Sequence, residues 1–253
     1  MSTIALPPSD SNTAPLSEPA RIINTFVAPS KTFTDIRRSA AWWGPFLVTA
    51  LIGLAFVYTV DKKITFRKVT DNQIAMSPKA SQRMEQMNAV DREVATARQA
   101  KITGYIAYCF TAFILIWFLI VSLVLLLTFK FGAGASDLTF SRIFAVCMYA
   151  GLPGVIKSLL AIGSIVAGVS PDGFTFQNPV GSNLGFYLTP GEISPFLYSV
   201  ATSLDLFMIW TLALAAIGLS CVSKLKRSTA FFGVFGWFIL LTLLSAALAG
   251  FTQ

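Results

Sequence analysis

Residues 102–129 read ITGYIAYCFTAFILIWFLIVSLVLLLTF and contain no charged side chain. A helix needs about 20 consecutive apolar residues to cross the hydrocarbon core of a bilayer, and this run exceeds that length. The whole chain has the same character, since 55% of its 253 residues are hydrophobic and 12% are charged. Soluble globular chains carry about 25% charged residues. The sequence therefore predicts an integral membrane protein.

Four further apolar runs are long enough to cross a membrane. They cover residues 40–60, 143–169, 195–222 and 229–251. None alternates between polar and apolar residues as the strands of a membrane barrel do. Ser194 followed by Pro195 is typical of a helix start, with the serine as N-cap. We therefore expect an all-α, polytopic transmembrane bundle of five helices over residues 40–252, with the two termini on opposite sides.

The chain before the first run divides into two parts. Residues 1–20 are rich in Pro, Ser and Thr and are expected to form a disordered tail. Residues 21–39 place apolar side chains at helical spacing among basic ones, which predicts an amphipathic segment in the membrane interface. The alternative is a tether that does not touch the membrane. The expected interfacial anchors are Phe26, Pro29, Phe33, Trp42 and Trp43.

Residues 61–101 form the one sizeable polar insert, with nine Lys or Arg and five Asp or Glu. From residue 79 to residue 101 the pattern predicts one amphipathic extramembrane helix. This helix either binds a partner or packs on its own bundle or on lipid. Its apolar stripe consists of Met84, Met87, Val90, Val94 and Ala97.

The distribution of basic residues indicates the orientation. If the N-terminus is cytoplasmic, the inner segments 1–39, 130–142 and 223–228 carry nine Lys or Arg. The outer loop 170–194 and the C-terminus carry none. Only the insert, with its nine basic residues, opposes this assignment. Because Lys and Arg concentrate in cytoplasmic loops, the other segments favour a cytoplasmic N-terminus.

Two charged residues interrupt the third and fourth runs. Lys157 precedes the loop between them by about a dozen residues, and Asp205 follows it at a similar distance. On antiparallel neighbouring helices they should lie at a similar depth, where an ion pair would lower the cost of burying each charge. A structural ion pair is the first interpretation, and a proton or ion pathway is the second.

The third run also has a face of small residues. Ala150, Gly154 and Ser158 are spaced four apart, which lets another helix approach closely. Pro153 removes a backbone hydrogen bond beside them and predicts a kink, close to Tyr149. The face serves either packing within the bundle or self-association.

Several functional classes are excluded by composition. The chain has no histidine and three scattered cysteines, so it has no Ser-His-Asp set and no zinc spacing. Asp205 is the only acid within a run, which excludes an aspartyl dyad. We therefore predict no catalytic residues, no metal and no cofactor. The net charge of +7 is best explained by contact with anionic lipid rather than with nucleic acid.

Three short motifs carry a resemblance to a known family. Residues 21–33 read RIINTFVAPSKTF, residues 42–45 read WWGP, and residues 148–154 read MYAGLPG. Their order on a five-helix plan resembles the Yip-one (Ypt-interacting) domain family, in particular its bacterial branch. The resemblance implies a polytopic helical protein with a cytosolic N-terminus and no established catalytic residues. Eukaryotic members contact Rab-type GTPases, but their Asp-Leu-Tyr-Gly-Pro signature is absent here.

These observations favour a non-enzymatic scaffold or adaptor in a multi-pass membrane location. The expected site is the bacterial cytoplasmic membrane, with the N-terminus in the cytoplasm. The expected partners are membrane lipids and an unknown protein, with self-association as a further possibility. The alternative function is a small transporter or channel that uses Lys157 and Asp205.

Overall fold

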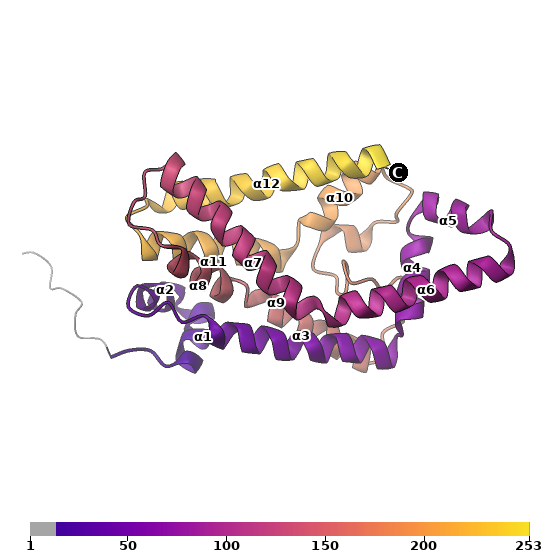
Figure 1. The fold of residues 1–253 in the computed structure, drawn as a ribbon, viewed down its shortest axis with the longest axis horizontal. Helices are drawn as coiled ribbons and strands as arrows, with labels where there is room; N and C mark the ends of the chain where they lie inside the picture. The colour runs from indigo at the N-terminus through magenta and orange to yellow at the C-terminus, as the bar shows by residue number, and fades with distance from the viewer. Residues whose placement is uncertain (1–13, 253) are drawn as a thin grey trace, which may run out of the picture.

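The computed structural model describes residues 14–252, and this part of the chain is helical without a strand (Figure 1). The first thirteen residues of the expected tail lie outside this range. Residues 18–20, expected to belong to the disordered tail, are instead helical, because α1 begins at Glu18 with Ser17 as its N-cap. The helices are α1 (Glu18–Val27), α2 (Pro29–Ile36), α3 (Trp43–Lys63), α4 (Phe66–Ala75), α5 (Pro78–Glu85), α6 (Ala89–Tyr108), α7 (Phe110–Leu127), α8 (Phe140–Ala150), α9 (Pro153–Val166), α10 (Pro195–Ser203), α11 (Leu206–Val222) and α12 (Arg227–Thr252). A π-helical turn, Thr128–Gly132, continues α7, and a short 3-10 helix, Leu184–Tyr187, lies in the loop before α10.

Four helical segments of the described chain are long and apolar enough to cross a membrane. They are Trp43–Lys63, Phe110–Gly132, Phe140–Val166 and Arg227–Phe251. The second of these starts later than the expected run 102–129, because α6 extends to Tyr108 and the helix breaks at Cys109. The third contains a break between α8 and α9, next to Pro153, where the sequence predicted a kink.

The fourth expected span, 195–222, is not one continuous helix. α10 ends at Ser203, and α11 begins at Leu206 with Asp205 as its N-cap. The Asp205 carboxylate accepts hydrogen bonds from the backbone N–H groups of Phe207 and Met208. This capping satisfies donors that would otherwise be exposed at the start of a helix. The predicted start of α10 is confirmed, because Ser194 is its N-cap and Pro195 its first residue.

The N-terminal segment does not present Phe33 to the membrane interface. α1 and α2 form a hairpin that packs on the bundle, with α2 against α11 and α8. Phe33 is fully buried there, in the main hydrophobic core. The aromatic ring of Phe26 is half-buried and meets the Trp210 ring edge-on, with 5.6 Å between the ring centroids. The expected anchors Phe26 and Phe33 therefore attach the hairpin to the protein, whereas Ile23 and Val27 form its exposed apolar surface.

Residues 79–101, predicted as one helix, belong to two helices, α5 and α6, and α4 precedes them in the insert. α4 packs against α6, and α5 connects them through turns at Ser77 and Asn88. Asn88 caps α6 by accepting a hydrogen bond from the N–H of Asp91 at 2.8 Å. This start interrupts the expected stripe, so Met84 and Met87 precede α6 whereas Val90, Val94 and Ala97 lie on it.

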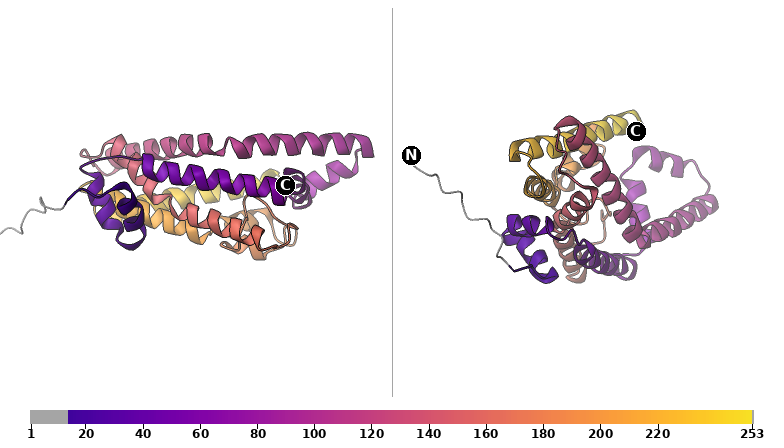
Figure 2. Two further views of the ribbon diagram at one scale, coloured as in Figure 1. Left: turned by 90° about the horizontal axis from the view of Figure 1, so that it is seen from below. Right: turned by 60° about the vertical axis from the view of Figure 1, so that its left-hand side comes forward.

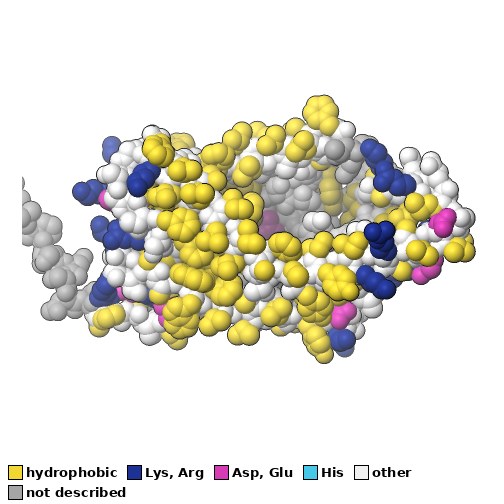
Figure 3. All heavy atoms as spheres, in the orientation of Figure 1, with side chains coloured by type: hydrophobic (Ala, Val, Ile, Leu, Met, Phe, Trp, Pro, Cys, Tyr) yellow, Lys and Arg dark blue, Asp and Glu magenta, His cyan; other side chains and the backbone are white. Residues whose placement is uncertain are grey.

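The molecule is elongated, and long helices such as α3, α6 and α12 run along its long axis (Figures 1 and 2). The α1–α2 hairpin lies at one end, and the α4–α6 insert projects from the other. Figure 3 shows Lys and Arg at the two ends and hydrophobic side chains over the middle of this face. We call this middle zone the apolar belt; its exposed members include Leu51, Ile116, Trp117, Ile239 and Leu243. The belt matches the surface that a bilayer requires.

Candidate functional site

The two charged residues of the apolar runs meet in the structure. The Lys157 ammonium, on α9, lies 2.9 Å from Oδ2 of Asp205 at the start of α11. The side chains are 22% and 8% exposed, respectively. The break between α10 and α11 makes this contact possible, because it places Asp205 at a helix start beside the middle of α9.

The Asp205 carboxylate also fixes the loop before α10. The Ser182 hydroxyl donates a hydrogen bond to Oδ2 of Asp205, and the N–H of Leu206 donates to the carbonyl of Ser182 at 2.9 Å. Two backbone N–H groups, the Ser182 hydroxyl and the Lys157 ammonium therefore share the carboxylate. An ionised carboxylate offers about four acceptor positions, so its capacity is filled. This geometry is that of a structural cap rather than of a carboxyl group free to exchange a proton.

The small residues of the third run have different surroundings. Ala150 is buried, whereas Gly154 is exposed and a Cβ added to it would meet nothing within 4 Å. Ser158 is half-buried and donates its hydroxyl to the carbonyl of Gly154 at 3.1 Å. Within residues 14–252, no other helix therefore makes the close packing that Gly154 would permit.

A buried polar cluster joins the two helices of the N-terminal hairpin. The Arg21 guanidinium on α1 forms an ion pair with Asp35 on α2, with 2.6 Å between Nη2 and Oδ2. Both side chains are almost fully buried. The hydroxyls of Thr25 and Thr32 donate to the Arg21 carbonyl at 2.8 Å each, and Arg38 forms a second ion pair with Asp35.

The cluster keeps both partners ionised. Burial alone would raise the pKa of Asp35, but hydrogen bonds from Arg21 and Arg38 lower that pKa below its usual value. Burial likewise opposes the charge of Arg21, but its hydrogen bond to Asp35 raises the arginine pKa. The hairpin is therefore stabilised by the ion pair between Arg21 and Asp35. Removal of either charge would leave the other buried without its partner.

The same cluster contacts the third run. The Tyr149 hydroxyl, at the end of α8, donates to Oε2 of Glu18 at 2.6 Å. Glu18 in turn lies 3.3 Å from Arg21. Tyr149 is fully buried, so its contact ties the start of α1 to the break between α8 and α9.

Sequence reasoning singled out Tyr149 but missed Glu18, Arg21 and Asp35. A signal was present, since Arg21 and Thr25 are four residues apart and Thr32 and Asp35 are three apart. Residues at this spacing share one face of a helix. Two short consecutive helices that each carry such a polar pair are expected to pack these faces against each other and form a hairpin.

The tryptophans at the start of α3 divide between core and surface. The ring of Trp42 meets that of Phe144 edge-on at 5.2 Å, whereas Trp43 is 53% exposed. Trp43 is thus available to an interface, together with Ile23 and Val27 of the hairpin.

An ion pair on the surface holds the insert together. The Arg67 guanidinium on α4 forms two hydrogen bonds with the Glu93 carboxylate on α6, at 2.7 and 2.8 Å. The hydrogen bond from Arg67 lowers the pKa of Glu93. Bidentate pairs of this kind also fix the relative orientation of two helices.

The insert also attaches to the loop before α10. The buried Asn72 carboxamide donates to the carbonyls of Pro171 and Phe174, at 2.8 and 3.0 Å. Lys68 forms a 2.6 Å ion pair with Asp172 of the same loop. Beside these contacts lies a cavity of about 540 Å³ between the insert, the loop and α10. No cluster of three or more His, Cys, Asp or Glu that could hold a metal ion occurs in residues 14–252.

Comparison with known proteins places the chain in one family. The model of the Yip1 domain matches residues 23–248, which include the second half of α1, all of α2, the insert and almost all of α12. No curated protein and no solved structure matches the chain. Since the match spans most of the sequence, this chain is a member of the Yip1 domain family of membrane proteins.

Proposed function

We propose that the protein is a non-enzymatic membrane scaffold whose insert recruits a protein partner. In this proposal the chain crosses the bilayer five times, with α10 and α11 together making the fourth crossing. The N-terminal hairpin faces the cytoplasm of a bacterial cell, and the insert lies on the opposite side of the cytoplasmic membrane.

The apolar character of α11 and its continuation by α10 support five crossings. α11 is 17 residues long and apolar, too short to meet the criterion for a full span by itself. α10 precedes it after a break of two residues, and its contacts with α12 continue those of α11. A broken helix is tolerated within a membrane where the freed backbone groups find partners, and Asp205 and Ser182 supply them here.

The observation that carries the scaffold proposal is the surface of the insert. Val90 and Val94 lie one turn apart on α6 and are 72% and 62% exposed. Both belong to the first two turns of α6, and the insert to which these turns belong projects past the apolar belt, where bilayer contact would not cover it (Figures 1 and 3). The ion pair between Arg67 and Glu93 holds α4 and α6 in a fixed arrangement. A rigid extramembrane unit with an uncovered apolar pair is suited to binding a protein.

Site-specific photocrosslinking tests this proposal. A photoreactive residue replaces Arg98, which is exposed and one turn after Val94. The tagged full chain is crosslinked in its native membrane, and adducts are identified by mass spectrometry. We expect one defined protein adduct that falls at least fivefold when Val90→Ser and Val94→Ser are combined.

Gln99→Ser provides the matched control, because Gln99 is exposed on the same helix but on another face. It should leave the adduct unchanged. Adducts to lipid or to second copies of the chain alone, or an adduct insensitive to both valines, would contradict recruitment by the insert.

A further inference from the structure

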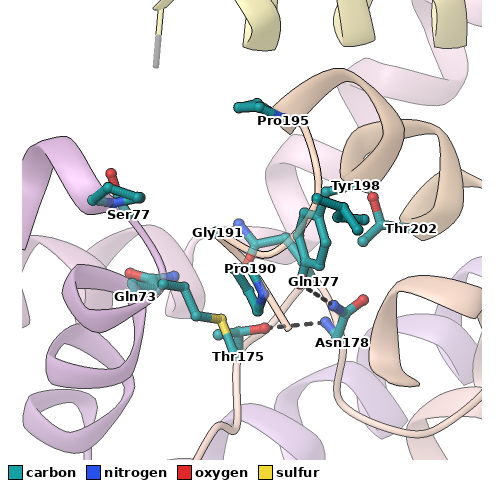
Figure 4. Close-up of a pocket in the computed structure, with 13 residues that line it drawn as sticks. Gln73, Ser77, Thr175, Gln177, Asn178, Pro190, Gly191, Pro195, Tyr198 and Thr202 are labelled. Atoms are coloured by element: carbon teal, nitrogen blue, oxygen red, sulfur yellow. Dashed lines mark hydrogen bonds between the residues drawn. The ribbon is translucent and has the colours of Figure 1, made fainter. Parts of the chain in front are cut away.

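The cavity beside the insert is assembled from three separate parts of the sequence. Gln73 and Ser77 come from the α4–α5 region, Thr175 and Gln177 from the loop before α10, and Tyr198 from α10 itself (Figure 4). The face drawn in Figure 3 is hollowed between α12 and α6, the region in which these segments lie. A volume of about 540 Å³ is in the range of small-molecule sites.

The walls of the cavity are held by specific contacts. The bonds from Asn72 and the Lys68–Asp172 pair fix α4 to the loop. On the other side, the buried Asn178 carboxamide donates to the Tyr198 hydroxyl at 3.1 Å and accepts from Asn183 at 2.9 Å. These contacts hold the segments on both sides of the cavity in place, so the fold itself maintains the cavity.

Several polar groups of the lining retain unused hydrogen-bonding capacity. The Tyr198 oxygen accepts from Asn178, but its own proton has no acceptor among residues 14–252. Gln73 is half-buried and Gln177 is exposed, and neither carboxamide is hydrogen-bonded to another residue among 14–252. Each carboxamide supplies donors and an acceptor, whereas the tyrosine supplies one donor.

The lining contains no Lys, Arg, Asp or Glu. Further polar groups of the lining come from Ser77, Thr175, Asn178 and Thr202, and its apolar side chains are those of Met76, Pro78, Pro190, Ile193 and Pro195. A charged ligand would lose its hydration there without gaining a counter-charge, which is costly. A ligand with several hydroxyl groups would find both donors and acceptors, and the apolar wall suits the C–H face of a ring.

We propose that this cavity binds an uncharged, polyhydroxylated group such as a sugar ring. The group belongs either to the headgroup of a neutral glycolipid or to a free saccharide. This inference is independent of the recruitment of a protein by Val90 and Val94, because it rests on different side chains.

Native mass spectrometry of the full chain tests the proposal. The protein is purified in a detergent without sugar, since a maltoside would compete for the site. The lipid probes are monoglucosyl- and monogalactosyl-diacylglycerol, with diacylglycerol and phosphatidylglycerol as references. The free probes are the methyl glucoside and the methyl galactoside, whose binding is measured by saturation-transfer NMR.

We expect a glycolipid to bind at least tenfold more tightly than either reference lipid. The double variant Gln73→Leu/Gln177→Leu should abolish this preference, because it removes both carboxamides at nearly constant size. Gln99→Leu, outside the cavity, should retain it. If the free glycoside alone binds with the same dependence on the variants, the sugar is supplied in solution.

Three outcomes would overturn the proposal. One is the absence of any preference for a sugar-bearing probe over the references. Another is tighter binding of phosphatidylglycerol than of the glycolipids. The third is equal glycoside binding by wild type and by the Gln73→Leu/Gln177→Leu variant, with the melting temperature showing that the variant is folded.

Discussion

Asp205 illustrates how a charged side chain can be structural inside an apolar run. Its carboxylate caps α11, pairs with Lys157 and holds Ser182 of the preceding loop. The cost of burying the charge is offset because each acceptor position has a donor. The residue therefore couples the break in the fourth run to α9 and to the loop.

Replacing Asp205 tests this structural role. Asp205→Asn should lower the free energy of unfolding by about 1.5–3 kcal/mol, since it removes two charge-assisted hydrogen bonds and leaves Lys157 without its partner. The melting temperature of the protein in lipid nanodiscs is the measurement.

Lys157→Met is the companion variant in a double-mutant cycle. Combined with Asp205→Asn, it should cost less than the sum of the two single changes, because the unpaired ammonium is gone. Additive effects would show that the pair contributes no coupling. An ion flux in liposomes that stops in Asp205→Asn, at unchanged melting temperature, would contradict the structural account.

The sequence suggested that Lys157 and Asp205 could pair, and the structure brings them together, but the break beside Asp205 was not predicted. Mean hydropathy is averaged over the run of residues 195–222, so two non-helical residues within it do not change the prediction of a span. The local signal was an aspartate directly before the apolar stretch that starts at Leu206, which is typical of an N-cap.

At the scale of elements, the α1–α2 hairpin is the main departure from the sequence-based expectation. Amphipathic periodicity predicted helices over residues 21–39 but did not specify what their apolar face would cover. That face packs on α11 and α8, where Phe33 and Ile36 are fully buried. An apolar stripe has the same pattern whether protein or lipid covers it, so only the tertiary contacts distinguish the two.

Gly218 on α11 permits this docking. A Cβ at this position would lie 2.5 Å from Val146 on α8 and 3.0 Å from the Phe33 ring. Gly218→Ala should therefore lower the free energy of unfolding by about 1–3 kcal/mol through overpacking. It should also speed tryptic cleavage at the exposed Lys31 and Arg37 by loosening the hairpin.

Gly236→Ala on α12 is the matched control. A Cβ there would meet nothing within 4 Å, so the higher helix propensity of alanine should leave stability equal or slightly greater. Melting temperature and limited proteolysis measure both variants. Equal behaviour of the two variants would contradict the close packing of α2, α8 and α11 around Gly218.

At the scale of the whole molecule, composition was sufficient to predict a helical membrane protein. The division of the insert into three helices was not predicted, because the helical spacing of its apolar residues continues across the turn at Asn88. Yet Ser77 before Pro78, and Asn88 three residues before Asp91, are both typical of helix starts. The cavity could not be predicted, since its walls come from segments about 100 residues apart in the chain.

The scaffold proposal depends on the hairpin and the insert lying on opposite sides of the membrane. Labelling of single cysteines with a membrane-impermeant maleimide tests this most directly, in a full chain whose three cysteines are replaced. Gln99→Cys reports on the insert and Lys31→Cys on the hairpin, and both positions are exposed. We predict that intact cells label Gln99→Cys, and that Lys31→Cys reacts only after the membrane is permeabilised. Labelling of both positions from the same side would contradict the five-crossing scaffold.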